Sequence, residues 1–175
     1  MKKYLIIISI CLAGLLMASC NKEKPVENKV TFGDYTENVQ VGIVGYSDMV
    51  HHVNGAGYHL DLDATINGVS CHFFISLSSS CKGKTIDLGK YDSGVVYHFE
   101  INSSAEDGYP FDIHHYNDKN FNDGAIDHSS VGTWFKSGKM TLKDDGKTIT
   151  FHTSGTTQDG RKFQLDVASE SKKFE

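Results

Sequence analysis

The sequence predicts an antiparallel β-sandwich of about eight strands joined by hairpins, and three observations support this fold class. Apolar and polar residues alternate with a period of two in several segments, as in strands that bury one face. Asn-Gly and Asp-Gly pairs lie between these segments, where they favour tight turns. The chain has 17 glycines, 2 prolines and many aromatic residues, which favours strands over helices. A closed up-and-down β-barrel of the calycin kind is the alternative, because it also buries alternate residues.

The first alternating segment contains Val39, Val41 and Ile43. The clearest hairpin follows, because alternating segments lie on both sides of Asn67-Gly68. A type I′ turn there is expected to align apolar or small residues on one face. The predicted pairs are Ile66 with Val69, Ala64 with Cys71, Leu62 with Phe73, Leu60 with Ile75, and Tyr58 with Leu77. A slip of one residue would destroy this match, so the register is well specified.

The middle of the chain predicts a short strand at 85–88, an alternating strand at 95–101 and then the longest irregular region, 102–130. Long loops on rigid sheets often bind ligands. Aromatic side chains in this loop either stack on a sugar ring or fill an apolar pocket, or else fold back over one end of the core. The four candidates for ligand binding are Tyr109, Phe111, Tyr116 and Phe121.

Two hairpins are predicted near the end of the chain. Residues 131–135 open a strand, and a two-residue turn at Asp145-Gly146 would pair Leu142 with Ile149 and Met140 with Phe151. For the last hairpin, a two-residue turn would set outward His152 opposite inward Val167. A three-residue turn, Gln158-Asp159-Gly160, sets Phe151 opposite Val167 instead, so we predict that form with its bulge.

The N-terminus predicts the location of the protein. Lys2 and Lys3 precede a 13-residue apolar run, Leu5 to Met17, and then Ala18-Ser19-Cys20. The run is shorter than the roughly 20 residues of a transmembrane helix. This segment resembles the lipobox of bacterial lipoproteins, whose processing enzymes cut before the cysteine and attach lipid to it. The resemblance implies a signal peptide at 1–19 and a lipid anchor, palmitate included, on Cys20.

The rest of the chain divides into a polar tether, 20–30, a β-domain, 31–168, and a polar tail, 169–175. The domain resembles the small β-rich lipoproteins of Bacteroidetes bacteria, most of which have no assigned activity. The resemblance implies a lipid-anchored protein of the cell envelope, in the outer membrane and facing either the periplasm or the surface. The net charge of −5 and the lack of a basic cluster exclude nucleic acid as a partner.

Cys71 and Cys81 are the cysteines that remain in the domain. An exported protein can keep a disulfide, so these two residues form a candidate bridge. The alternative is a buried free Cys71 and an exposed Cys81.

Nine histidines suggest a metal site, although the adjacent pairs His51-His52 and His114-His115 would point to opposite faces of a strand. The Asn-Gly register puts His72 across from Asp63, with Cβ atoms about 5 Å apart and Asp61 diagonally nearby. This arrangement is half of a metal site for zinc, an acid–base dyad, or a cross-strand contact of structural value only.

A second metal candidate is the segment that begins Asp118-Lys-Asn120-Phe-Asn122. Alternating Asp and Asn oxygens suit calcium. The segment departs from the EF-hand because glycine comes at the seventh position and Ser129 stands at the twelfth. The alternative is a polar loop rich in turn-forming residues.

The sequence contains no HExxH, CxxC or GxSxG motif. We therefore expect a non-enzymatic envelope lipoprotein that binds a glycan, a peptide or another envelope protein. The second hypothesis is a metal-dependent hydrolase that uses His72, Asp63 and other histidines that folding brings close to them. The third hypothesis is a lipocalin-like carrier with its ligand inside a barrel. The predicted inward side chains argue against it, because they are too bulky to leave a cavity.

Overall fold

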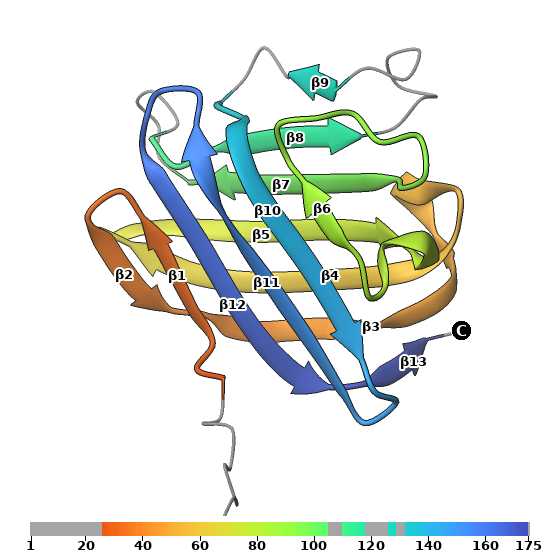
Figure 1. The fold of residues 1–175 in the computed structure, drawn as a ribbon. Helices are drawn as coiled ribbons and strands as arrows, with labels where there is room; N and C mark the ends of the chain where they lie inside the picture. The colour runs from red at the N-terminus through yellow and green to blue at the C-terminus, as the bar shows by residue number, and fades with distance from the viewer. Residues whose placement is uncertain (1–25, 105–109, 118–125, 129–131, 175) are drawn as a thin grey trace, which may run out of the picture.

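The computed structural model describes residues 26–104, 110–117, 126–128 and 132–174, without the side chains of 126–128. These residues form two sheets that pack face to face, and the strands of one layer cross those of the other diagonally (Figure 1). The predicted β-sandwich is therefore confirmed, and the alternative of one closed barrel is wrong. No helix in the described part of the chain is long and apolar enough to cross a membrane.

The first sheet has six strands, which are in spatial order β2 (Tyr35–Asn38), β1 (Lys29–Phe32), β12 (Lys162–Glu170), β11 (Thr148–Thr157), β10 (Phe135–Asp144) and β6 (Thr85–Asp87). The second has seven, in the order β13 (Lys172–Phe174), β3 (Gln40–Val50), β4 (Gly55–Ile66), β5 (Val69–Ser78), β7 (Tyr97–Ser103), β8 (Ile113–Asn117) and β9 (Ile126–His128). Two short 3-10 helices, η1 (His51–Val53) and η2 (Ser79–Cys81), follow β3 and β5. The strands that were not predicted are β1, β2, β8, β9 and β13, which have three to five residues each and are too short to show a clear alternation.

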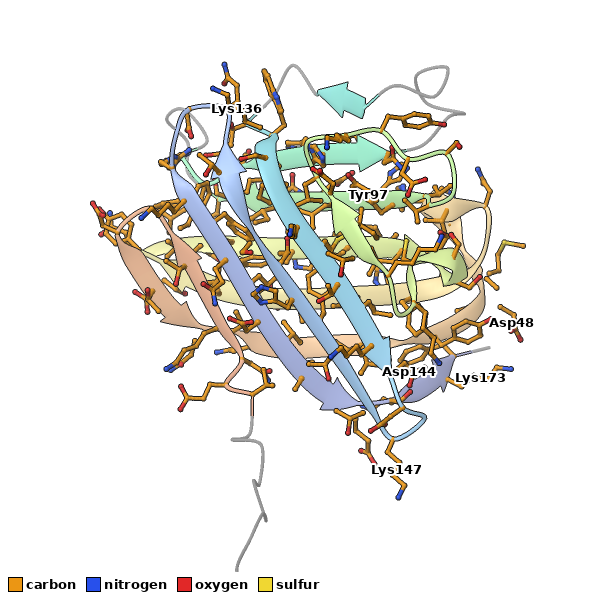
Figure 2. The ribbon with its side chains drawn as sticks, viewed as in Figure 1. Asp48, Tyr97, Lys136, Asp144, Lys147 and Lys173 are labelled. Carbon is orange, nitrogen blue, oxygen red and sulfur yellow. The ribbon has the colours of Figure 1, made fainter. Side chains whose placement is uncertain are left out.

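The core lies between the two layers, and side chains fill the space there (Figure 2). Phe99 of β7 meets Phe135 of β10 and Phe163 of β12, with ring centroids 5.2 and 5.8 Å away. Both contacts are edge-to-face, a favourable arrangement for aromatic rings. Because bulky residues such as Tyr97 and Phe99 are fully buried in this core, we do not propose a lipocalin-like carrier.

Two of the predicted hairpin registers are confirmed. In the β4–β5 hairpin every predicted pair is present, from Ile66 with Val69 to Tyr58 with Leu77. Both turn residues have positive φ, 49° at Asn67 and 79° at Gly68, as a type I′ turn requires. In the β11–β12 hairpin, Phe151 lies opposite Val167, as predicted.

The β10–β11 hairpin differs from its prediction by two residues. Leu142 pairs with Phe151 rather than with Ile149, and Met140 pairs with Thr153 rather than with Phe151. The last pair before the turn is Asp144 with Ile149, so the loop has four residues. The Asp145 carboxylate holds this loop by accepting hydrogen bonds at 2.8 and 2.7 Å from the second and third N–H groups after it. A shift of two keeps the same side chains inward, so the buried face was still predicted correctly.

Two other segments differ from their predictions. The supposedly irregular region 102–130 contains β8 and β9. The supposed polar tail, 169–175, continues β12 to Glu170 and then forms β13, which pairs in parallel with β3. The ion pair of Lys173 with Asp48, at 3.1 Å, lies at this edge of the sheet (Figure 2).

Cys71 and Cys81 are both buried and both free, so the predicted disulfide is wrong, as is the alternative of an exposed Cys81. Cys71 lies near the start of β5, whereas Cys81 lies in η2, beyond its far end. A strand rises about 3.3 Å per residue, so the part of β5 between the two cysteines far exceeds the roughly 7 Å that a disulfide can span.

Candidate functional site

The outer face of the seven-stranded sheet collects polar, imidazole and aromatic side chains on its central strands. We call this surface the histidine face. It consists of His59, Asp61 and Asp63 on β4, His72, Phe74 and Ser76 on β5, His98 and Glu100 on β7, and His114 and Tyr116 on β8. The outward position of these side chains follows from strand alternation, because the neighbouring residues on each strand face the core.

An apolar pocket of about 300 Å³ opens at one end of the histidine face. It is lined by Ile43, Ser47, Met49 and Val50 of β3, His51 and His52 of η1, His59 of β4, Phe74 and Ser76 of β5, and Phe174 of β13. Met49 is 71% exposed and Ile43 is 41% exposed, so part of this apolar surface is open to solvent. The pocket therefore combines segments that are far apart in the sequence.

Aromatic contacts shape the pocket. The His52 ring lies 5.0 Å from the Phe74 ring and 5.2 Å from the His98 ring. The His59 ring also contacts Phe74, with ring centroids 4.6 Å apart. η1 can turn over the sheet at this point because Asn54, which follows it, adopts a left-handed conformation with φ 50°.

β13 closes another side of the pocket. The Phe174 ring lies directly over Gly45 of β3, where an added Cβ would be only 2.1 Å from Phe174 Cε2. A side chain at position 45 would thus displace this ring. Glycine there allows the C-terminal strand to contribute an aromatic wall.

Two polar groups of the pocket have unusual surroundings. Burial lowers the pKa of His59, although the nearby Asp61 carboxylate opposes this shift, so its imidazole is neutral at pH 7. The Ser76 hydroxyl is fully buried and has no hydrogen-bond partner among the described residues. Such an unpaired hydroxyl is costly unless a ligand or water satisfies it.

The predicted contact of His72 with Asp63 is confirmed and lies next to the pocket. His72 Nδ1 is 3.1 Å from Asp63 Oδ1, and His72 Nε2 is 3.7 Å from Asp61 Oδ1. All three side chains are partly exposed, by 45%, 56% and 31% for His72, Asp63 and Asp61 respectively. A protonated imidazole can donate to both carboxylates, and a neutral one leaves a nitrogen free to bind a metal.

The adjacent histidines at 114 and 115 point to opposite faces, as predicted. His114 Nδ1 lies on the histidine face, 3.2 Å from the Tyr116 hydroxyl, which donates to Glu100 Oε1 at 2.5 Å. His115 is buried in the core, with Nε2 3.1 Å from the Tyr97 hydroxyl. The two side chains therefore do not converge on one site.

The predicted aromatic ligand site is not assembled in the described residues. Phe111 is 5% exposed and packs against Phe32, with ring centroids 5.5 Å apart. Tyr116 is 7% exposed on β8. The remaining sequence-predicted residues lie outside the described part of the chain, and these are Cys20, Tyr109, Phe121 and the calcium candidates Asp118, Asn120 and Asn122.

Sequence reasoning missed the apolar pocket, although one signal for it was present. Phe74 occupies a position where alternation predicts an outward side chain, between His72 and Ser76. A large aromatic residue on a predicted polar face indicates that another element covers it. Nothing in the alternation indicated that η1 and Phe174 would do so.

Comparison with known proteins identifies no relative, because no protein-family model, curated protein or solved structure matches this chain.

Proposed function

We propose that this chain is a lipid-anchored, non-enzymatic binding protein of the cell envelope, which holds a small molecule in the apolar pocket of the histidine face. The observation that carries this proposal is the partly exposed apolar pocket itself, which Met49, Phe74 and Phe174 line from three different strands. The tether and the lipobox-like segment before the domain support the anchored location.

The lining of the pocket indicates the chemistry of the ligand. Its surface is mainly apolar and includes the Phe74 and Phe174 rings, so an apolar or aromatic body fits best. His59 is neutral because burial lowers its pKa, which favours an uncharged molecule. A volume of about 300 Å³ is at the lower end of the range for small-molecule sites.

A titration with N-phenyl-1-naphthylamine, a neutral dye that fluoresces in apolar surroundings, tests this proposal. We expect saturable binding of one dye per chain. The variant Ser76→Leu fills the pocket floor and should weaken binding at least about tenfold, equivalent to about 1.4 kcal/mol.

Thr150→Leu is the matched control, because Thr150 faces outward on β11 of the other sheet. It should leave dye binding unchanged. The proposal fails if Ser76→Leu binds the dye as tightly as the parent chain while its circular dichroism is unaltered, or if both variants weaken binding equally.

Metal-dependent hydrolysis is the second candidate function. The observation in its favour is that Asp61, Asp63 and His72 each bring a ligand atom within 4.8 Å of the others. Its first requirement is a bound ion, which the next subsection addresses.

A further inference from the structure

Three potential metal ligands converge in the middle of the histidine face. Asp61 and Asp63 are two residues apart on β4 and so project from the same side of the strand. His72 lies directly opposite Asp63 on β5. Their ligand atoms lie within 4.8 Å of one another, whereas two donors on one zinc ion lie about 3 to 4 Å apart. Small rotations of exposed side chains are enough to close that difference.

The local charge favours a cation. The two carboxylates repel each other, and His72 is the only ion-pair partner that either has in the described part of the chain. When the imidazole is neutral, the group carries two negative charges and a free nitrogen. A divalent ion would neutralise the carboxylates and use that nitrogen.

The surroundings allow an ion to enter and to complete its coordination shell. All three side chains are at least 31% exposed. A polar hollow of about 320 Å³ adjoins Asp63 and is lined by oxygen-bearing side chains that include Glu37, Gln40 and Ser70. Asp63 is the one ligand of the three that lines this hollow, so water can approach the site from the side of Asp63.

We propose that Asp61, Asp63 and His72 form a site for a divalent transition-metal ion, with Zn²⁺ as the best match. One imidazole nitrogen and two carboxylate oxygens suit zinc, which in accessible sites keeps three protein ligands and one open position. Calcium is a poorer match because it takes six to eight oxygen ligands. The donors lie on two central strands, β4 and β5, with β3 and β7 on either side, so the backbone presents them in a fixed register.

The rival explanation is a protonated His72 that bridges the two carboxylates without any metal. Isothermal titration of Zn²⁺ into the untagged full-length chain in detergent separates the two. Every sample carries Cys11→Ser and Cys20→Ser, so that thiols outside the described residues bind no zinc. The expected result is one zinc per chain.

His72→Asn and Asp63→Asn should each weaken zinc binding at least about 100-fold, because loss of an outer-shell partner alone costs roughly 10- to 100-fold. The matched control is His152→Asn. His152 Nδ1 lies 2.6 Å from Asp166 Oδ1, so this pair resembles His72 and Asp63. The other Asp166 oxygen accepts a hydrogen bond from the Gln164 side chain, whereas at the proposed site a second carboxylate lies close to the imidazole. This control should bind zinc like the parent.

A second readout is the His72 imidazole resonance, which zinc should shift while the His152 resonance stays in place. Absence of zinc binding at millimolar zinc overturns the proposal, as does an equal loss in His72→Asn and His152→Asn. Thermal unfolding of each variant without metal shows whether the fold is intact. Dye binding in the apolar pocket is measured separately, so failure of this proposal does not depend on the proposed function.

Discussion

At the scale of single residues, one hydrogen bond joins the two sheets at the edge of the core. The Tyr58 hydroxyl of β4 donates to Asp144 Oδ2 at the end of β10, at 3.1 Å. Burial and this contact raise the pKa of Tyr58. Burial opposes a downward shift at Asp144, but the Gly146 N–H, the Tyr58 hydroxyl and Lys82 together lower the pKa of that carboxyl. The ionised Asp144 is therefore favoured by folding.

Replacing Tyr58 with phenylalanine removes this bond and keeps the ring. We expect Tyr58→Phe to lower the free energy of unfolding by about 1.5 to 3 kcal/mol at pH 7, as for a hydrogen bond to a charged group. A carboxyl whose pKa is lowered by folding contributes stability above its ordinary value of 3.8 and loses it as pH falls through the folded value. The difference between the two proteins in urea unfolding should therefore shrink below about pH 3.8.

The matched control is Tyr91→Phe, because Tyr91 is 39% exposed. It should unfold like the parent at both pH values. A loss in Tyr58→Phe that stays constant down to pH 2 would show that the ionised Asp144 is not the partner that matters.

At the scale of elements, the hairpins show how far turn chemistry specifies a sheet. The β4–β5 turn needs positive φ at two residues, and Asn67-Gly68 supplies both. Gly57, at the other end of β4, has a different role, because a Cβ there would lie 2.2 Å from the Leu77 carbonyl oxygen. One glycine is thus needed for its backbone conformation and the other for close approach of two strands.

Alanine at these two glycines should therefore have different costs. At Gly68 an added Cβ meets nothing within 4 Å, so Gly68→Ala should cost only the left-handed backbone conformation, about 1 kcal/mol. Gly57→Ala must push two paired strands apart and should cost about 2 to 3 kcal/mol. Chemical denaturation measures both. Equal costs for the two variants would contradict the close approach at Gly57.

The same comparison explains what could be predicted from the sequence. Alternation and the Asn-Gly turn are local signals, so the pairs of β4 and β5 were predictable, and with them the contact of His72 with Asp63. The β10–β11 register was not, because side-chain hydrogen bonds from Asp145 lengthen the loop without changing which residues face inward. The apolar pocket was not predictable either, because η1 and Phe174 reach it through tertiary packing.

At the scale of the whole molecule, the first strand of the domain and the proposed site belong to different layers. The tether leads into β1, in the six-stranded sheet, whereas the histidine face is the outer surface of the seven-stranded sheet. If the protein is held through the segment before β1, the attached strand lies in one layer and the apolar pocket lies on the other (Figure 1).

The proposed anchor makes a direct prediction about Cys20. In a bacterium with a lipoprotein pathway, Cys20→Ala should abolish incorporation of labelled palmitate and move the protein from the membrane fraction to the soluble fraction. A membrane anchor requires such acyl chains, since each buried methylene contributes about 0.8 kcal/mol. Cys11→Ala is the control and should remain labelled. Equal labelling of both variants would exclude lipid attachment at position 20.

The two unbridged thiols of the domain have a consequence for how this protein matures. Cys71 and Cys81 each pack as a small apolar side chain, and burial raises the pKa of both, to about 11 at Cys71. Formation of the described sandwich therefore requires no oxidant and no disulfide-exchange enzyme. The same architecture should arise in the reducing interior of a cell as in an oxidising compartment outside it.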